Sequence, residues 1–327
     1  KLGKTMTIRT PTLSLLTLLI LFPTMAAAND EPPADGDTWL DHRHKGVSKR
    51  LDKWSNRIDD WFGEPNPDHP ADANLRLMLD TEWNPDDKFT VTPRVRGRLK
   101  LPTLEKKVHV VFGDDSLDDE LKHEANAYRN RTNTNGRIFD ASQSRDKNAS
   151  IAVRWSEAFV KQRIDTDFDI GIRSGSDLFA RAKSSSNWQL TDNIDTSLEQ
   201  IYRYGIKSKH HVRTNWETRY IPSERSFIAN QAHLQYEHDK TEDWTWGNSL
   251  FRQHNLGKHR HVNYGVYTGG NIEKRKAALN TYGPFTTYRQ PIWRNWLFTQ
   301  TEVNYYNNRK ENQKHRVGAL LRIEALF

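Results

Sequence analysis

The feature that most constrains the fold is a strict alternation of apolar and polar side chains over long segments. In "RIDTDFDIGIRS" one face carries Ile164, Thr166, Phe168, Ile170 and Ile172, and the other carries Asp165, Asp167, Asp169, Gly171 and Arg173. The segments "HVRTNWETRY" and "FIANQAHLQYE" alternate in the same way. A period of two indicates β-strands. These segments are longer than the roughly 5 to 6 residues typical of strands in globular proteins.

The alternation predicts fourteen strands. An even number is typical of outer-membrane barrels and leaves both ends of the barrel on the same side of the membrane. Twelve strands is the alternative, because the first strands have the weakest alternation. The predicted ranges are 74–83, 88–101, 106–113, 150–158, 162–174, 177–185, 188–204, 210–221, 226–237, 242–254, 261–270, 276–288, 293–306 and 314–327.

Composition favours a membrane barrel over a soluble sandwich. Only 35% of residues are hydrophobic and the mean hydropathy is -0.88, yet aromatic residues reach 11% and gather towards the ends of the alternating segments. An outer-membrane barrel needs an apolar outer band, aromatic girdles at both interfaces and a polar interior. We therefore predict an all-β membrane protein, with an antiparallel transmembrane β-barrel over residues 73–327 and a long extracellular loop at 114–149.

The first residues predict export. Lys1, Lys4 and Arg9 precede the apolar run "LSLLTLLILF", and small residues end at Ala28. This order is typical of a secretory signal. The run is about half the roughly 20 residues that a spanning helix needs. We expect residues 1–28 to be a cleaved signal peptide and the mature protein to lie in the outer membrane of a Gram-negative bacterium.

Residues 29–72 predict a linker and one amphipathic helix at 38–62. Apolar residues recur at helical spacing on one stripe, formed by Val47, Leu51, Trp54, Ile58 and Trp61. Gly63 and Pro65 follow, as expected where a helix ends. The helix has four possible roles: it plugs the lumen, lies along the inner leaflet, docks on a periplasmic partner, or packs against its own barrel.

The polar faces of the strands are candidate lumen-lining surfaces. They carry acidic and basic residues in similar number: Asp165, Asp167, Asp169, Arg173, Arg181, Arg203, Arg213, Glu217, Arg219, Glu237, Glu302, Arg322 and Glu324. One hypothesis is a channel or transport protein for small hydrophilic solutes, in which these charges sort the solutes. The alternative is a closed structural or envelope-assembly barrel that acts through its periplasmic helix.

Other chemistries find little support in the sequence. There are no cysteines, which excludes disulfides and thiolate sites. Asp41, His42 and His44 lack a clear further metal ligand, and "DDSLDDE" lacks the spaced ligands of a calcium loop. No stretch matches the His-x-Ser-x-Gly motif of outer-membrane phospholipases, so a lipid hydrolase is the least favoured alternative. We expect no enzyme, no cofactor, no metal and no nucleic-acid partner.

The last segment, "HRVGALLRIEALF", resembles the C-terminal recognition strand of Gram-negative outer-membrane proteins, with Gly318, Leu321, Ile323, Ala325 and Phe327 at matching places. The stretch 294–298, "RNWLF", is similar to the penultimate strand of an uncharacterised family of proteobacterial barrels. The likeness covers roughly 73–327 and brings no activity with it. It implies recognition by the barrel-assembly machinery and contact with outer-membrane lipid and lipopolysaccharide. A periplasmic partner of the helix is a further expectation.

Overall fold

The computed structural model describes residues 38–60, 72–85, 88–101, 107–114, 149–159, 163–174, 176–223, 225–238, 243–257, 259–308 and 313–327. The predicted signal peptide and nearly all of the long loop at 114–149 lie outside these residues. One helix, α1 (Trp39–Asp60), precedes the strands. Among the residues described, no helix has both the length and the apolar character that crossing a membrane would require.

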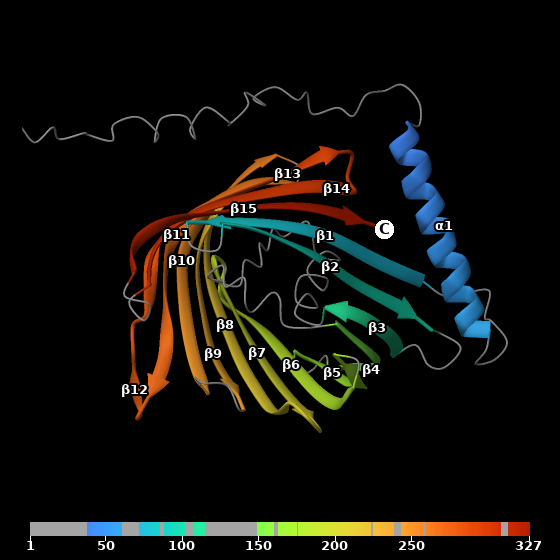
Figure 1. Cartoon of the computed structure of the whole chain (residues 1–327), viewed down its shortest axis with the longest axis horizontal. Helices are drawn as coiled ribbons and strands as arrows, with labels where there is room; N and C mark the ends of the chain where they lie inside the picture. The colour runs from blue at the N-terminus through green and yellow to red at the C-terminus, as the bar shows by residue number, and fades with distance from the viewer. Residues whose placement is uncertain are drawn as a thin grey trace, which may run out of the picture. The chain divides into compact units, whose positions relative to one another are not determined.

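The strands form a closed antiparallel barrel (Figure 1). Strands β1 to β11 pair in sequence order, β13 pairs with β11 and β14, and β15 pairs with β14 and closes the barrel on β1. The bounds are β1 (Asp72–Asn84), β2 (Lys88–Lys100), β3 (Val108–Asp114), β4 (Ala149–Phe159), β5 (Ile164–Arg173), β6 (Asp177–Thr191), β7 (Ile194–Gly205), β8 (Lys209–Ser223), β9 (Ser226–Glu237), β10 (Trp244–Gly257), β11 (Arg260–Glu273), β12 (Lys276–Ala277), β13 (Thr281–Trp293), β14 (Leu297–Asn308) and β15 (Gln313–Leu326).

The prediction of fourteen barrel strands is confirmed within the described residues, and the alternative of twelve is wrong. The two-residue β12 is an extra strand that pairs only with the end of β11. Several predicted boundaries are also wrong, among them the turn expected at 289–292, which lies at 294–296 because β13 continues to Trp293. The turn expected at 186–187 lies at 192–193, because alternation continues through the serine run to Asp192 and Asn193. β11 and β13 are displaced likewise, since β11 continues to Glu273 and β13 begins only at Thr281.

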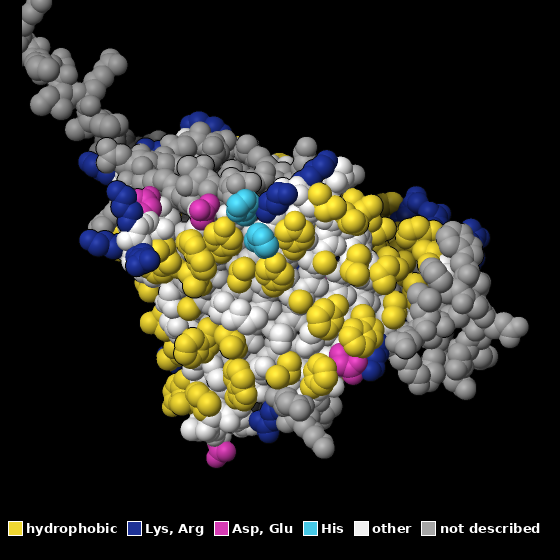
Figure 2. Space-filling view, turned by 90° about the horizontal axis from the view of Figure 1, so that it is seen from below, with side chains coloured by type: hydrophobic (Ala, Val, Ile, Leu, Met, Phe, Trp, Pro, Cys, Tyr) yellow, Lys and Arg dark blue, Asp and Glu magenta, His cyan; other side chains and the backbone are white. Residues whose placement is uncertain are grey.

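Burial shows that the barrel is organised inside-out relative to a soluble protein. On β4, Ile151 and Val153 are 57% and 53% exposed, whereas Arg154 is only 4% exposed. Apolar side chains face outward along the other strands too, and Figure 2 shows them spread over the outer surface with charged groups at its margins. Water would penalise such a surface, and lipid would not. The fold is therefore a transmembrane barrel of the outer-membrane type.

The barrel closes where β15 meets β1. Their ladder runs from the pair Arg76 and Leu326 to the pair Trp83 and Ala319. Phe327 extends it: its amide donates to the Leu75 carbonyl at 2.8 Å, and the Leu75 amide donates back at 3.0 Å. This seam joins the two ends of the barrel segment and lies beside α1 (Figure 1).

Candidate functional site

The candidate site is the inner wall of the barrel. Strand register and the alternation of burial place all thirteen predicted lumen-lining residues on this inner face. They do not converge on one point. They are spread over β5 to β9, β14 and β15. The wall is best described cluster by cluster.

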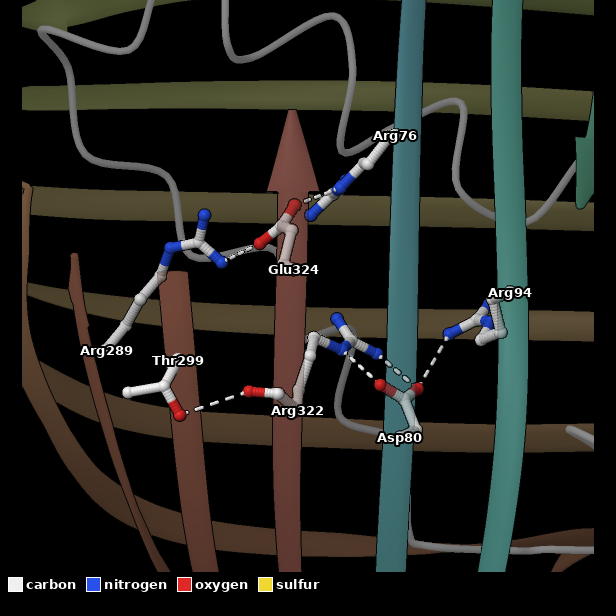
Figure 3. Close-up of polar contacts among 7 residues, drawn as sticks. All are labelled: Arg76, Asp80, Arg94, Arg289, Thr299, Arg322 and Glu324. Atoms are coloured by element: carbon white, nitrogen blue, oxygen red, sulfur yellow. Dashed lines mark hydrogen bonds and ion pairs between the residues drawn. The ribbon is translucent and has the colours of Figure 1, made fainter. Parts of the chain in front are cut away.

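The first cluster lies across the β15–β1 seam (Figure 3). Glu324 lies between two arginines: Arg76 on β1 and Arg289 on β13 both donate to its carboxylate. The side chain of Glu324 is 1% exposed. A buried carboxylate that accepts from two guanidinium groups is strongly fixed in position. Glu324 is thereby held on the wall, although it lies on the last strand.

One step further along the seam, Asp80 has the same arrangement. Arg322 donates to it through two nitrogens, Nε at 2.7 Å and Nη2 at 2.8 Å, and Arg94 Nη1 lies 3.5 Å away (Figure 3). The backbone carbonyl of Arg322 accepts from Thr299 Oγ1 at 3.2 Å. The predicted residues Arg322 and Glu324 are therefore brought into one region, together with partners that the sequence did not single out.

The second cluster lies on β4, β5 and β6. Arg154 donates to Asp169 through Nε at 2.7 Å and Nη2 at 2.8 Å, and Arg181 Nη2 lies 2.8 Å from the same carboxylate. Asp167, two residues away, accepts from Ser156 Oγ at 2.8 Å. Arg154 was missed by the sequence analysis. Its register opposite Asp169 is the signal that could have found it, since oppositely charged residues pair across strands.

The third cluster extends over β6 to β9. Lys183 Nζ lies 2.7 Å from Glu199, which also accepts from Asn215 at 2.7 Å. Arg213 donates to Asn215 at 2.8 Å. Nearby, Arg219 pairs with Asp195, and Gln231 donates to Glu217 at 2.5 Å. Hydrogen-bonded side chains thus continue around more than half of the wall.

The remaining predicted residues lie between these clusters or at the rims. Arg173 is half-buried near the end of β5, Arg203 is buried on β7, and Glu302 is buried on β14. Glu237 ends β9 and accepts a long hydrogen bond from Gln235 at 3.5 Å. Asp165 is exposed at the start of β5. These residues share the inner face with the three clusters.

The wall also carries an aromatic cluster that local alternation did not predict. Phe227, Phe251, Phe285 and Tyr267 face inward on β9, β10, β13 and β11, and they pack together around the buried Ala229. The rings of Phe251 and Phe285 are 6.4 Å apart, with a tilted geometry. This aromatic cluster lies among buried polar residues of the same strands, such as Gln253, Asn263 and Thr287, whereas most ion pairs lie on β15, β1, β2 and β4 to β6.

The charged side carries an excess of positive charge. Glu324, Asp80 and Asp169 each face two arginines, so each of these three groupings has one net positive charge. Guanidinium groups stay protonated in proteins. These three groupings therefore give the inner face local positive charge.

The described residues contain no cluster of three or more His, Asp or Glu side chains that could hold a metal ion. Two histidines that the sequence places near strand ends lie on the outer face against tyrosines. His210 Nδ1 is 2.9 Å from the Tyr202 hydroxyl, and His254 Nε2 is 3.1 Å from the Tyr264 hydroxyl. These pairs form part of the aromatic belts where the barrel meets the two membrane interfaces.

The helix α1 is the second candidate site, and it lies against the outside of the barrel. Leu51 and Ile58 pack against a buried apolar cluster of Ala73, Leu99 and Leu101. By register and alternation, these three residues belong to the outward faces of β1 and β2. This contact corresponds to the fourth predicted role, packing against its own barrel, and α1 does not occupy the lumen.

The start of α1 is fixed to the β13–β14 turn. Thr38 caps the helix: its amide and hydroxyl donate to Asp41 at 3.0 and 2.8 Å. The same carboxylate accepts from Trp293 Nε1 at 3.3 Å and lies 2.9 Å from Arg294 Nη2. Burial alone would raise the pKa of Asp41, but the hydrogen bonds from Thr38 and Trp293 and the charge of Arg294 hold it at about 2.

One turn later, α1 contacts the end of β15. The His44 ring stacks on Trp296 and Phe327, with centroids 4.4 and 4.7 Å apart. His44 Nε2 is 2.7 Å from the Leu326 carbonyl. The helix therefore bridges the β13–β14 turn, the last strand and the β1–β2 pair, which together flank the closing seam.

The predicted helix stripe and assembly segment are only partly used in these contacts. Val47 is half-buried on α1, Trp54 is 53% exposed, and Trp61 lies outside the described residues. On β15, Gly318 faces inward against Asn304, whereas Leu321, Ile323 and Ala325 face outward. Recognition of this segment by assembly machinery remains a prediction.

No known protein family matches this chain, and no curated protein matches it. Among solved structures, it is similar to a loop-deletion variant of OmpT, an outer membrane protein of Vibrio cholerae, with 8% identity, coverage of 79% of this chain and 99% of the other, and a TM-score of 0.47. OprB of Pseudomonas putida gives 10% identity, coverage of 79% and 92%, and a TM-score of 0.44. The KdgM porin gives 6% identity, coverage of 76% and 98%, and a TM-score of 0.35. Likeness at these identities concerns the course of the backbone alone.

Proposed function

We propose that this barrel is a channel for small hydrophilic solutes and that it favours anions over cations. The observation that carries the proposal is the repeated grouping of one inner carboxylate with two arginines, seen at Glu324, Asp80 and Asp169. Fixed charges along a pore wall select ions by sign. A barrel of fourteen strands has an interior wide enough for such a passage.

The proposal includes a location and an orientation. The barrel spans the outer membrane of a Gram-negative bacterium after removal of residues 1–28, and its outer wall contacts lipid and lipopolysaccharide. The end of the barrel where α1 and Phe327 lie faces the periplasm, because short turns lie at that end and the long segment between β3 and β4 lies at the other. Short periplasmic turns and longer extracellular loops are the rule in such barrels.

A closed structural barrel is the second candidate, and the inner aromatic cluster favours it. Phe251 is 3% exposed and Tyr267 is 3% exposed, although both face the interior. Packed rings on one wall reduce the space available to a solute. In this alternative the barrel acts through α1, and the inner charges serve only to satisfy one another.

Planar-bilayer recording of the refolded full-length chain separates the two candidates. We expect steady conductance and, under a salt gradient, a reversal potential of the sign for anion preference. Arg213→Glu should shift the reversal potential towards cation preference, because Arg213 lies half-buried on the inner face of β8. Arg163→Glu, an exposed turn position, is the matched control and should leave it unchanged. A folded protein that conducts no current would overturn the channel proposal and support the closed barrel.

A further inference from the structure

Within the described part of the chain, the surface of α1 can be divided into a face that packs on the barrel and two flanks. The first, with Leu51 and Ile58, packs on the outer wall. The second, called here the Trp/Arg flank, consists of Trp39, Arg43, Arg50, Trp54 and Arg57. The third, called the lysine flank, consists of His42, Lys45, Lys49, Lys53 and Asn56. Spacings of three, four and seven residues place the members of each flank on one side of a helix.

The Trp/Arg flank exposes large aromatic rings beside cations. Trp39 is 68% exposed and Trp54 is 53% exposed. Arg43 lies over the Trp39 ring, 5.4 Å from its centroid, and Arg50 and Arg57 are exposed. Tryptophan prefers the interface between lipid and water, because one part of its ring is apolar and its N–H is polar. Arginine binds phosphate through paired hydrogen bonds.

The position of α1 supplies an independent observation. The residues beneath it, Ala73, Leu99 and Leu101, continue the outward, lipid-facing rows of β1 and β2. Those rows expose Leu79 and Val95 further along the same strands, at 42% and 39%. The contact of α1 with the barrel is thus continuous with the lipid-facing surface, at the end of the strands (Figure 1). A helix at that level lies where phospholipid headgroups surround a barrel.

We infer that α1 is an interfacial helix whose Trp/Arg flank binds the headgroups of anionic phospholipids, in the leaflet at the end of the barrel where α1 lies. The arginines take the phosphate groups, and Trp39 and Trp54 enter the boundary between headgroups and acyl chains. Amphipathic helices with cations and tryptophan bind membranes in this way. This inference concerns the outer wall and does not depend on whether the lumen conducts.

Two matched double variants test the inference in the full-length protein, refolded in vesicles of phosphatidylcholine with or without phosphatidylglycerol. Arg50→Glu with Arg57→Glu reverses two charges on the Trp/Arg flank, and Lys49→Glu with Lys53→Glu reverses two on the lysine flank. Native mass spectrometry then counts the phosphatidylglycerol retained after extraction. We expect a several-fold loss for the arginine pair and little change for the lysine pair. Equal losses, or no loss from the arginine pair, would overturn the inference.

A second experiment measures how deeply each flank of α1 lies in the lipid, and it does so without reversing any charge. Because the chain has no cysteine, Trp54→Cys and Asn56→Cys each give one labelling site, on opposite flanks of α1. A fluorophore at position 54 should be quenched by brominated phosphatidylglycerol, whereas one at position 56 should not. If neither label is quenched, the helix does not contact lipid, and a soluble partner becomes the occupant to seek.

Discussion

At the scale of single residues, the inner wall depends on carboxylates that would be unfavourable alone. Asp169 is 3% exposed and is paired with the guanidinium groups of Arg154 and Arg181. Removing one partner from a buried ion pair costs more than the pair contributes, because the other charge remains buried and unpaired. The wall should therefore respond very differently to mutation at a buried, paired carboxylate and at an exposed carboxylate of the same strand.

Asp169→Asn should lower the free energy of unfolding by about 2–4 kcal/mol, since it leaves two buried arginines without their carboxylate. Asp165→Asn is the matched control on the same strand and face, where the side chain is exposed. It should change stability by less than about 0.5 kcal/mol. Equilibrium urea unfolding of the refolded barrel in vesicles measures both. Similar changes in the free energy of unfolding for the two variants would show that the pairing of Asp169 with the two arginines does not stabilise the barrel.

At the scale of elements, α1 is held by its first turn and by its apolar stripe. Asp41 both caps the helix through Thr38 and fixes it to the β13–β14 turn through Trp293 and Arg294. Its pKa of about 2 lies below the ordinary value of 3.8. The charged form therefore favours the docked helix, and this contribution is complete above the ordinary pKa and is lost as pH falls towards 2.

A spin label at Asn56→Cys should report this behaviour, because position 56 is exposed on α1. The label should stay in one motional state from neutral pH down to about pH 5, and a more mobile component should grow as pH falls from about 4 towards 2. Asp41→Asn should show the mobile component already at neutral pH. A variant that keeps the helix immobile at neutral pH would show that the apolar stripe holds α1 without Asp41.

At the scale of the whole molecule, alternation in long segments, together with the aromatic residues towards the segment ends, was enough to predict the barrel. A period of two fixes which residues face inward once a strand is recognised, so Asp169 and Arg322 could be assigned to the inner face before any contact was known. The ends of the strands were harder to predict from the sequence. The turn at Asp192 and Asn193 was missed because the preceding serine run resembles a turn in composition while it continues the strand in register.

Two other features could not be read from local pattern. Phe251 and Phe285 are apolar residues on the inner face, where alternation predicts polar ones, and their rings come together only when the sheet is folded. The amphipathic stripe of α1 predicts an apolar partner but does not say which. The surface formed by Leu99 and Leu101 on the outer wall becomes visible only when β1, β2 and the helix are placed together.

The central claim is that the strands form a membrane barrel in which one face of each strand lines the interior and the other meets lipid. Single cysteines on β7 test it most directly, at inward positions 197 and 201 and outward positions 198 and 200. In protein refolded into vesicles, we predict that a membrane-impermeant thiol reagent labels the cysteines that replace Ser197 and Ile201, while those that replace Leu198 and Gln200 stay protected. Equal labelling of all four positions, or faster labelling of the outward pair, would contradict the account.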